Sequence, residues 1–170
     1  MSTLRVDNIQ DQGGAERRGL KTYAIICDSK GVNDNGGTAT AGAFRTRDLN
    51  TKIADPDNIV SIASNQFTLG AGDYLIEASA PGYRVDRHVT RLQNITTGTT
   101  VQYGTAEYSN YTYVIYNRSF VVARVSLTSS TTFELQHRVN TTIATQGFGV
   151  SSSWTGSNSI FAVVKIYKEA

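Results

Sequence analysis

Apolar and polar residues alternate with a period of two along much of this chain. In the clearest example an apolar series alternates with a polar one: Phe133, Leu135, His137 and Val139 against Glu134, Gln136 and Arg138. A period of two places the two series on opposite faces of a β-strand. Such signals recur about every ten residues, and no segment shows the helical period. The pattern predicts an antiparallel sandwich or barrel of roughly eight to ten strands.

The predicted strands are separated by turns rich in Gly, Asn, Ser and Pro. We expect strands at residues 20–28, 59–63, 66–69, 74–80, 84–95, 99–107, 120–127, 132–139 and 160–168. Residues 41–49 are expected to be extended, with Arg45 and Arg47 on one face. Pro81-Gly82 is expected to bend or bulge the chain, because proline cannot donate to a strand ladder.

Composition supports β structure in a single domain. Val, Ile and Thr, which suit a pleated and half-buried surface, each outnumber Leu. The net charge of +2 does not require an acidic partner, and it argues against nucleic-acid binding. The single cysteine, Cys27, lies in an apolar run and is expected to be a buried thiol. We expect no membrane insertion, because no apolar run approaches the length of a spanning helix.

A short hairpin motif carries a family resemblance. Phe67-Thr68, the turn Gly70-Ala71-Gly72-Asp73 and Tyr74 form a strand, a tight turn and a second strand. This unit resembles the core hairpin of the tumour necrosis factor-like (TNF-like) jelly roll, the fold of the complement globular head. With the strands before and after it, the resemblance covers roughly residues 20–168. It implies an all-β antiparallel jelly-roll sandwich that forms homotrimers and binds rather than catalyses, with no cofactor.

The first residues of the chain carry a second resemblance. Residues 2–11, Ser-Thr-Leu-Arg-Val-Asp-Asn-Ile-Gln-Asp, resemble the start of many bacteriophage tail-fibre and virion appendage proteins. The resemblance implies an attachment arm whose apolar contacts are Leu4, Val6 and Ile9. A polar, Gly-rich linker follows it. We therefore divide the chain into an N-terminal anchor arm and linker at 1–19 and a jelly-roll head at 20–170.

Aromatic residues are the candidate ligand contacts. Five tyrosines fall within residues 103–116, and tyrosine offers a rigid apolar ring with a hydroxyl, which suits sugar binding. On this interpretation Tyr108, Tyr111 and Trp154 are the exposed contacts. The alternative is that these tyrosines line a strand or a trimer interface.

Other polar groups have plainer interpretations. His88 and His137 could form a metal or acid–base site, but His137 lies on the apolar side of its strand, which favours a core or interface histidine. Oxygen-rich clusters at residues 28–35 and 55–57 could bind calcium, although Asx turns explain them better. Arg84, Arg87 and Arg91 could meet an anionic partner or pair with acids across a subunit boundary. No metal-ligand or catalytic motif is present, so we expect no enzyme and no resident metal.

Together these features favour a trimeric virion protein of a tailed phage, assembled in the host cytoplasm. Its partners would be its own copies, other virion proteins and a host-surface glycan. One alternative is a capsid decoration (cement) or head-fibre protein that stabilises the shell. A second is a non-viral, lectin-like binding module. A third alternative is an enzyme that degrades polysaccharide. Turnover of host polysaccharide is the measurement that would identify it.

Overall fold

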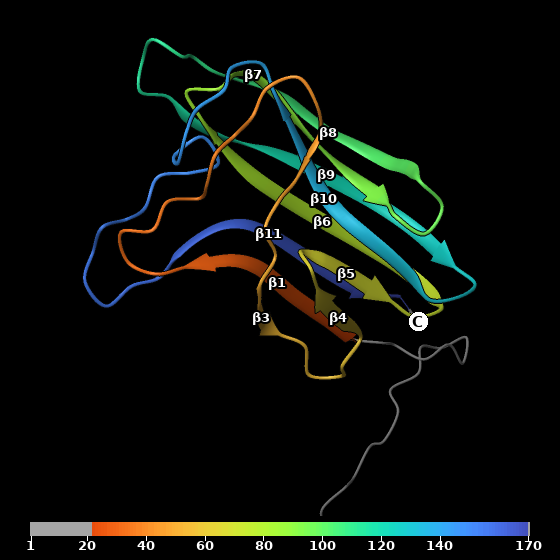
Figure 1. Cartoon of the computed structure of the whole chain (residues 1–170). Helices are drawn as coiled ribbons and strands as arrows, with labels where there is room; N and C mark the ends of the chain where they lie inside the picture. Colours follow the sequence, from red (N-terminus) through yellow and green to blue (C-terminus); the bar gives the residue numbers. More distant parts are fainter. Residues whose placement is uncertain (1–21, 170) are drawn as a thin grey trace, which may run out of the picture.

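The computed structural model describes residues 22–169, which form two antiparallel β-sheets without a helix (Figure 1). The strands are β1 (Thr22–Lys30), β2 (Arg45–Thr46), β3 (Thr51–Ala54), β4 (Val60–Ala63), β5 (Gln66–Leu69), β6 (Gly72–Tyr83), β7 (Asp86–Asn94), β8 (Thr99–Ser109), β9 (Tyr116–Leu127), β10 (Thr131–Val139) and β11 (Ser159–Lys168). The five-stranded sheet has the order β3-β1-β11-β6-β9. The six-stranded sheet has the order β4-β5-β10-β7-β8, with β2 paired to β10.

The facing sides of the two sheets form the core. Across the five-stranded sheet the strand register aligns buried rows, such as Ala24–Ile166–Ile76–Ala123. The six-stranded sheet contributes Phe67 and Phe133, whose stacked rings lie 5.5 Å apart between centroids. Burying a large apolar side chain contributes about 1.5–3 kcal/mol. The apolar positions of the period-two pattern are therefore the positions that pack between the two sheets.

The two sides of the sandwich have very different edges. On one side β8 and β9, eleven and twelve residues long, lie against each other. The Thr105 carbonyl accepts from the Ser119 hydroxyl at 2.7 Å, and the Phe120 amide donates to the Thr105 hydroxyl at 3.0 Å. At the opposite edges lie β3 and β4, which are four residues each. The long edges thus cover each other, and the outer edges are short.

The expected strands are found, with four differences. The hairpin expected around the turn at residues 70–73 does not form, because β5 and β6 pair in different sheets and the turn connects the two sheets. The extended segment at 41–49 forms only the short strand β2, and β3 was not expected from the sequence. Arg45 is exposed whereas Arg47 is completely buried, so the two arginines do not share an environment. The bend or bulge expected at Pro81-Gly82 is not found, because both residues continue β6 in unbroken register with β9. Pro81 lies beyond the last pair with β11, at Ser79, so its missing amide interrupts no β6–β11 bond.

The loop before β11 fits tightly over the core at Gly149. This residue has a φ of +138°, and a Cβ built there would lie 2.2 Å from the Phe161 ring. We expect Gly149→Ala to lower the free energy of unfolding by about 1–3 kcal/mol, since both the backbone and the ring must shift. Urea unfolding followed by circular dichroism measures this. Gly70→Ala is the control, because a Cβ there meets open space; equal stability of the two variants would contradict the prediction.

Candidate functional site: a polar network ending at a surface groove

A buried arginine links the two sheets at one end of the sandwich. Arg47 follows β2, and its backbone amide donates to Leu135 of β10 at 2.8 Å. Its guanidinium donates to the Pro81 carbonyl of β6 at 2.9 Å and to the Phe148 carbonyl at 2.8 Å. It also lies over the Phe148 ring, 4.1 Å from the centroid. Within residues 22–169 it has no carboxylate in hydrogen-bond contact, so carbonyls and a ring stabilise its charge.

Two buried histidines extend the hydrogen-bond network from Arg47, and each hydrogen bond along it has only one possible donor. Arg47 must donate to His137 Nδ1, which lies 3.2 Å away, because a guanidinium has no acceptor. Neutral His137 therefore carries its proton on Nε2 and donates it to His88 Nδ1 at 2.9 Å. His88 in turn donates from Nε2 to Asn117 Oδ1 at 2.8 Å. The tautomer of each ring is fixed by its neighbour.

The network keeps both histidines neutral. Burial lowers the pKa of His137 well below its usual value, and the charges of Arg47 and His88 lower it further. Burial also lowers the pKa of His88, although its hydrogen bond to Asn117 and the nearby Glu107 act in the opposite direction. Burial lowers the pKa of Arg47 to about 10, which leaves it charged at neutral pH. The alternative of a histidine metal or acid–base pair is thus disfavoured, because both ring nitrogens of each are occupied.

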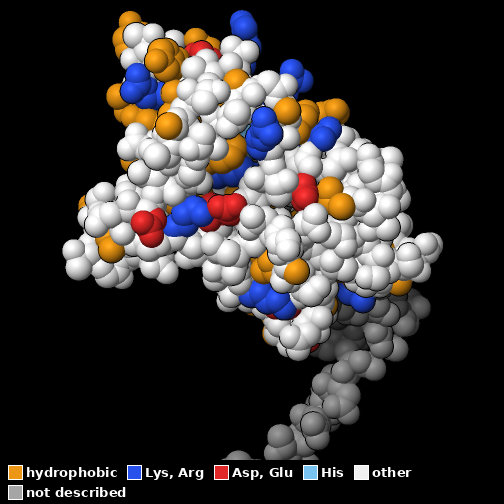
Figure 2. All heavy atoms as spheres, in the orientation of Figure 1, with side chains coloured by type: hydrophobic (Ala, Val, Ile, Leu, Met, Phe, Trp, Pro, Cys, Tyr) orange, Lys and Arg blue, Asp and Glu red, His pale blue; other side chains and the backbone are white. Residues whose placement is uncertain are grey.

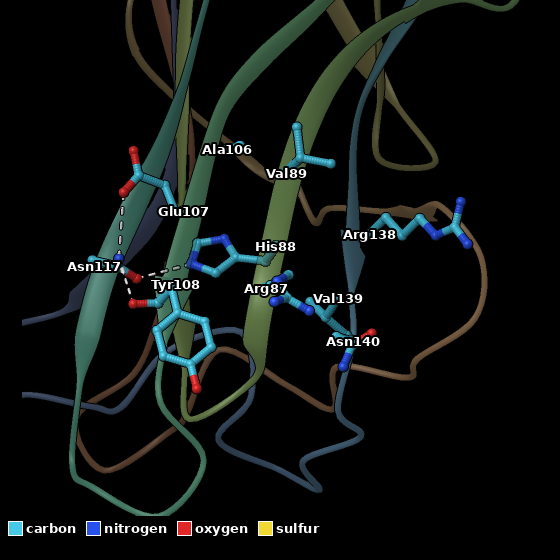
Figure 3. A pocket seen from close by; sticks show the side chains of 10 residues that line it. All are labelled: Arg87, His88, Val89, Ala106, Glu107, Tyr108, Asn117, Arg138, Val139 and Asn140. Atoms are coloured by element: carbon cyan, nitrogen blue, oxygen red, sulfur yellow. Dashed lines mark hydrogen bonds between the residues drawn. The ribbon is translucent and has the colours of Figure 1, made fainter.

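The network ends at an open groove of about 940 Å³ on the outside of the sandwich (Figure 3). Asn117 donates to the Tyr108 carbonyl at 3.3 Å and to the Glu107 carboxylate at 3.4 Å, so it fixes the β8 wall of the groove. Side chains from four segments line the groove: Arg87, Glu107, Tyr108, Asn117, Arg138 and Asn140. This groove combines charged groups, an aromatic ring and amides, which is a composition suited to binding.

The structure separates the three aromatic residues expected to bind ligand. Tyr108 lines the groove with its side chain half-exposed. Tyr111 lies in the β8–β9 connection, where its ring is 5.3 Å from the Arg84 guanidinium. Trp154 is exposed in the loop before β11. Neither Tyr111 nor Trp154 lines this groove, and the role of the three residues as ligand contacts stays a prediction. The proposed arm contacts Leu4, Val6 and Ile9 lie outside the described residues.

The β8–β9 connection also carries a cluster of exposed apolar side chains. Tyr111, Tyr113 and Val114 are all exposed there. Hydrophobic side chains gather at this end of the molecule, at the upper left of Figure 2. A second, more apolar groove of about 470 Å³ lies between Val114, Tyr116 and Ile160. The tyrosine-rich segment therefore forms surface in this protomer and not core.

Asp28 and Asp55, one residue from each oxygen-rich cluster, have partners within the protein. The ammonium of Lys30 lies 2.7 Å from the Asp48 carboxylate and 3.2 Å from that of Asp28, whose pKa is raised by burial. The Asp55 carboxylate accepts from the Ile59 amide at 2.8 Å and lies 2.6 Å from the Lys52 ammonium. Among residues 22–169 no three His, Cys, Asp or Glu side chains are grouped to hold a metal ion.

The three arginines of the β7 region have separate contacts. Arg84 donates to the Tyr111 carbonyl, and Arg91 stacks on Phe44 with 4.0 Å between its guanidinium carbon and the ring centroid. Arg87 is exposed at the groove. Sequence reasoning named Arg87 only together with Arg84 and Arg91, for an anionic partner or for acids across a subunit boundary. It did not identify Arg47, Arg138 or Asn117 as members of a site. The polar series of β10 placed Arg138 on the outer face, and that was the one available signal.

These features define an all-β jelly-roll sandwich of the TNF and complement globular-head type, as the resemblance of the sequence predicted. The globular domain of zebrafish complement 1qA protein is similar, with a TM-score of 0.58 and 12% identity over 88% of this chain and 98% of that chain. Murine APRIL at pH 5.0 is similar with a TM-score of 0.53 and 8% identity over 85% of this chain and 98% of that chain. At these identities the likeness shows the fold. No protein-family model and no curated protein matches the sequence.

Proposed function

We propose that this chain is a homotrimeric, non-enzymatic binding module whose copies associate through the outer face of the five-stranded sheet. The apolar character of that face is the observation that carries the proposal. On β9, Phe120 and Val122 are 52% and 60% exposed. The register aligns them with outward positions of β6 and β11, which adds Leu75, Val163 and Tyr167 to the same face.

The size and charge of this face suit a second copy. Five strands about 4.8 Å apart and about nine residues long give roughly 700 Å², close to the ~800 Å² that each partner of a stable interface buries. The central charges, Lys165 and Glu77, lie 3.6 Å apart and neutralise each other. Arg124 is paired with Glu169 at 2.6 Å. These two ion pairs lower the cost of covering the face with a partner, because each charge keeps its counter-ion.

The number of copies comes from the resemblance to the TNF-like jelly roll, whose members form trimers.

The finer part of the proposal is that the trimer is a virion component of a tailed phage that adheres to host-surface glycan. The resemblance of residues 2–11 to phage appendage proteins supports it. Three copies present three equal sites, and multivalency converts weak contacts into useful avidity. Antibody labelling of purified particles in the electron microscope tests this part; the absence of label on any particle would reject it.

We expect Val122→Glu to abolish the trimer, because it buries a carboxylate without a partner at each interface. Light scattering should give three times 18.5 kDa for the wild-type chain and 18.5 kDa for the variant. Ser61→Glu adds the same charge on the exposed edge strand β4 and should remain trimeric. A monomeric wild-type chain, or a trimer that survives Val122→Glu, would overturn the proposed assembly.

A further inference from the structure

The groove beside β7 has two chemically different ends. Figure 3 shows Glu107 and Asn117 at one end, on the β8–β9 side, and Arg138 and Asn140 at the other, on β10 and just after it. Arg87 and Tyr108 lie between them. The strand register places Arg87, Tyr108 and Arg138 on the outer face of the sheet, whereas Glu107 is paired with the inward-facing His88. A ligand on the outer face therefore meets the two arginines and the tyrosine ring together.

The arginines at the cationic end have no side-chain partner among the described residues. Within residues 22–169, the side chains of Arg87 and Arg138 make no hydrogen bond or ion pair, and both are exposed. Arg91, on the same strand as Arg87, instead donates to Gln136 at 2.8 Å and to Thr100 at 3.0 Å. A guanidinium presents a planar fork that matches a carboxylate. Arg87 and Arg138 can thus receive an anionic group from outside.

The opposite end is held rigidly and accepts hydrogen bonds. Glu107 accepts from the Thr105 hydroxyl at 2.8 Å and from Asn117, whose position is set by His88. Between the two ends, the half-exposed ring of Tyr108 offers a face for an apolar or sugar ring.

We propose that this groove binds a carboxylated saccharide, a uronate or a similar acidic sugar. Its carboxylate is held by Arg87 and Arg138, its ring lies on Tyr108, and its hydroxyls bond with the side-chain amide of Asn140. The inference rests on the proposed function, because it names the ligand class of the binding module. It depends only on groups of one protomer, so three equivalent grooves occur in a trimer.

The test uses the full chain and calorimetric titration with trigalacturonic acid, with neutral maltotriose as the uncharged counterpart. We expect binding of the acidic sugar alone. The double variant R87K/R138K retains the net charge but loses the planar forks, and Tyr108→Ala loses the ring. Each should weaken binding at least about tenfold, a loss of about 1.4 kcal/mol. Tyr108→Phe and Lys52→Ala, on the distant edge strand β3, should bind as the wild type does.

The outcomes separate this inference from the proposed function. Equal binding of maltotriose, or undiminished binding by R87K/R138K, overturns the inference, and so does the absence of binding by a chain that light scattering shows to be trimeric. A monomeric chain that binds trigalacturonic acid supports the groove and rejects the trimer. Titration with a sialylated trisaccharide distinguishes a terminal acidic sugar from a uronate within a chain. Circular dichroism of each variant confirms that the substituted, exposed side chains leave the fold intact.

Discussion

Replacing Arg47 by alanine is expected to lower the free energy of unfolding by about 3–5 kcal/mol. The variant leaves a cavity where the largest fully buried side chain was, between the two sheets. It also removes the donor to His137 and to the carbonyls of Pro81 and Phe148. A buried acceptor without a partner costs about 1–3 kcal/mol. Urea unfolding at pH 7.5, followed by circular dichroism, measures the loss.

Two further variants show which part of Arg47 matters. Arg45→Ala, two residues earlier and exposed, should change stability by no more than about 0.5 kcal/mol. Arg47→Met keeps much of the volume and removes the charge, so its loss should be smaller than that of Arg47→Ala. If Arg47→Ala proves as stable as Arg45→Ala, the guanidinium does not hold the two sheets together.

Mild acid is expected to destabilise the fold, by up to about 2 kcal/mol for each of His88 and His137 between pH 7.5 and pH 5. Burial lowers the pKa of both rings below the unfolded value of 6.5. Between the folded and unfolded pKa values the unfolded chain binds more protons. Stability is therefore complete above about pH 7 and is lost as the pH falls below 6.5. Protonation also forces two donors to face each other, because Arg47 already donates to His137.

Other charged groups near the two histidines also affect the pH dependence of stability, and they determine which control variants are needed. Arg47 faces His137 and lowers its pKa, whereas Glu107 beside His88 raises that of His88. Asp28 acts in the opposite sense, since burial raises its pKa and its protonation favours the folded state. Urea unfolding at pH 7.5 and pH 5 gives the dependence. His137→Asn should reduce it by about half, and Arg47→Met should weaken it by releasing the pKa of His137. Wild-type stability that does not change over this range would refute the argument.

The strands and the fold could be predicted because they depend on a pattern that is local in the sequence. The alternation at Phe133–Val139 places His137 inside with the same regularity that places Arg138 outside. The turn between Phe67 and Tyr74 is also found, and Gly72 adopts a positive φ of 142°. What the local sequence did not show is that this turn joins the two sheets and does not close a hairpin. These signals need no knowledge of distant residues.

The polar network could not be predicted because its members are neighbours only in three dimensions. Arg47 lies 90 residues from His137 and 101 from Phe148, and an arginine in a polar segment gives no sign that it is buried. The groove is equally non-local, since Tyr108 and Arg138 come from different strands. The expected ligand site was chosen on residue type, so it joined Tyr108 with Trp154, which lies outside this groove.

The unequal edges of the sandwich have a consequence for crowding. Where many copies are fixed close together, as on the surface of a particle, an open strand edge invites pairing with the next molecule and uncontrolled growth of a shared sheet. Here the longest edges, β8 and β9, are covered by each other through Thr105 and Ser119, and the free edges β3 and β4 offer four residues each. The molecule can therefore be packed densely while each copy remains separate from neighbours outside its own assembly.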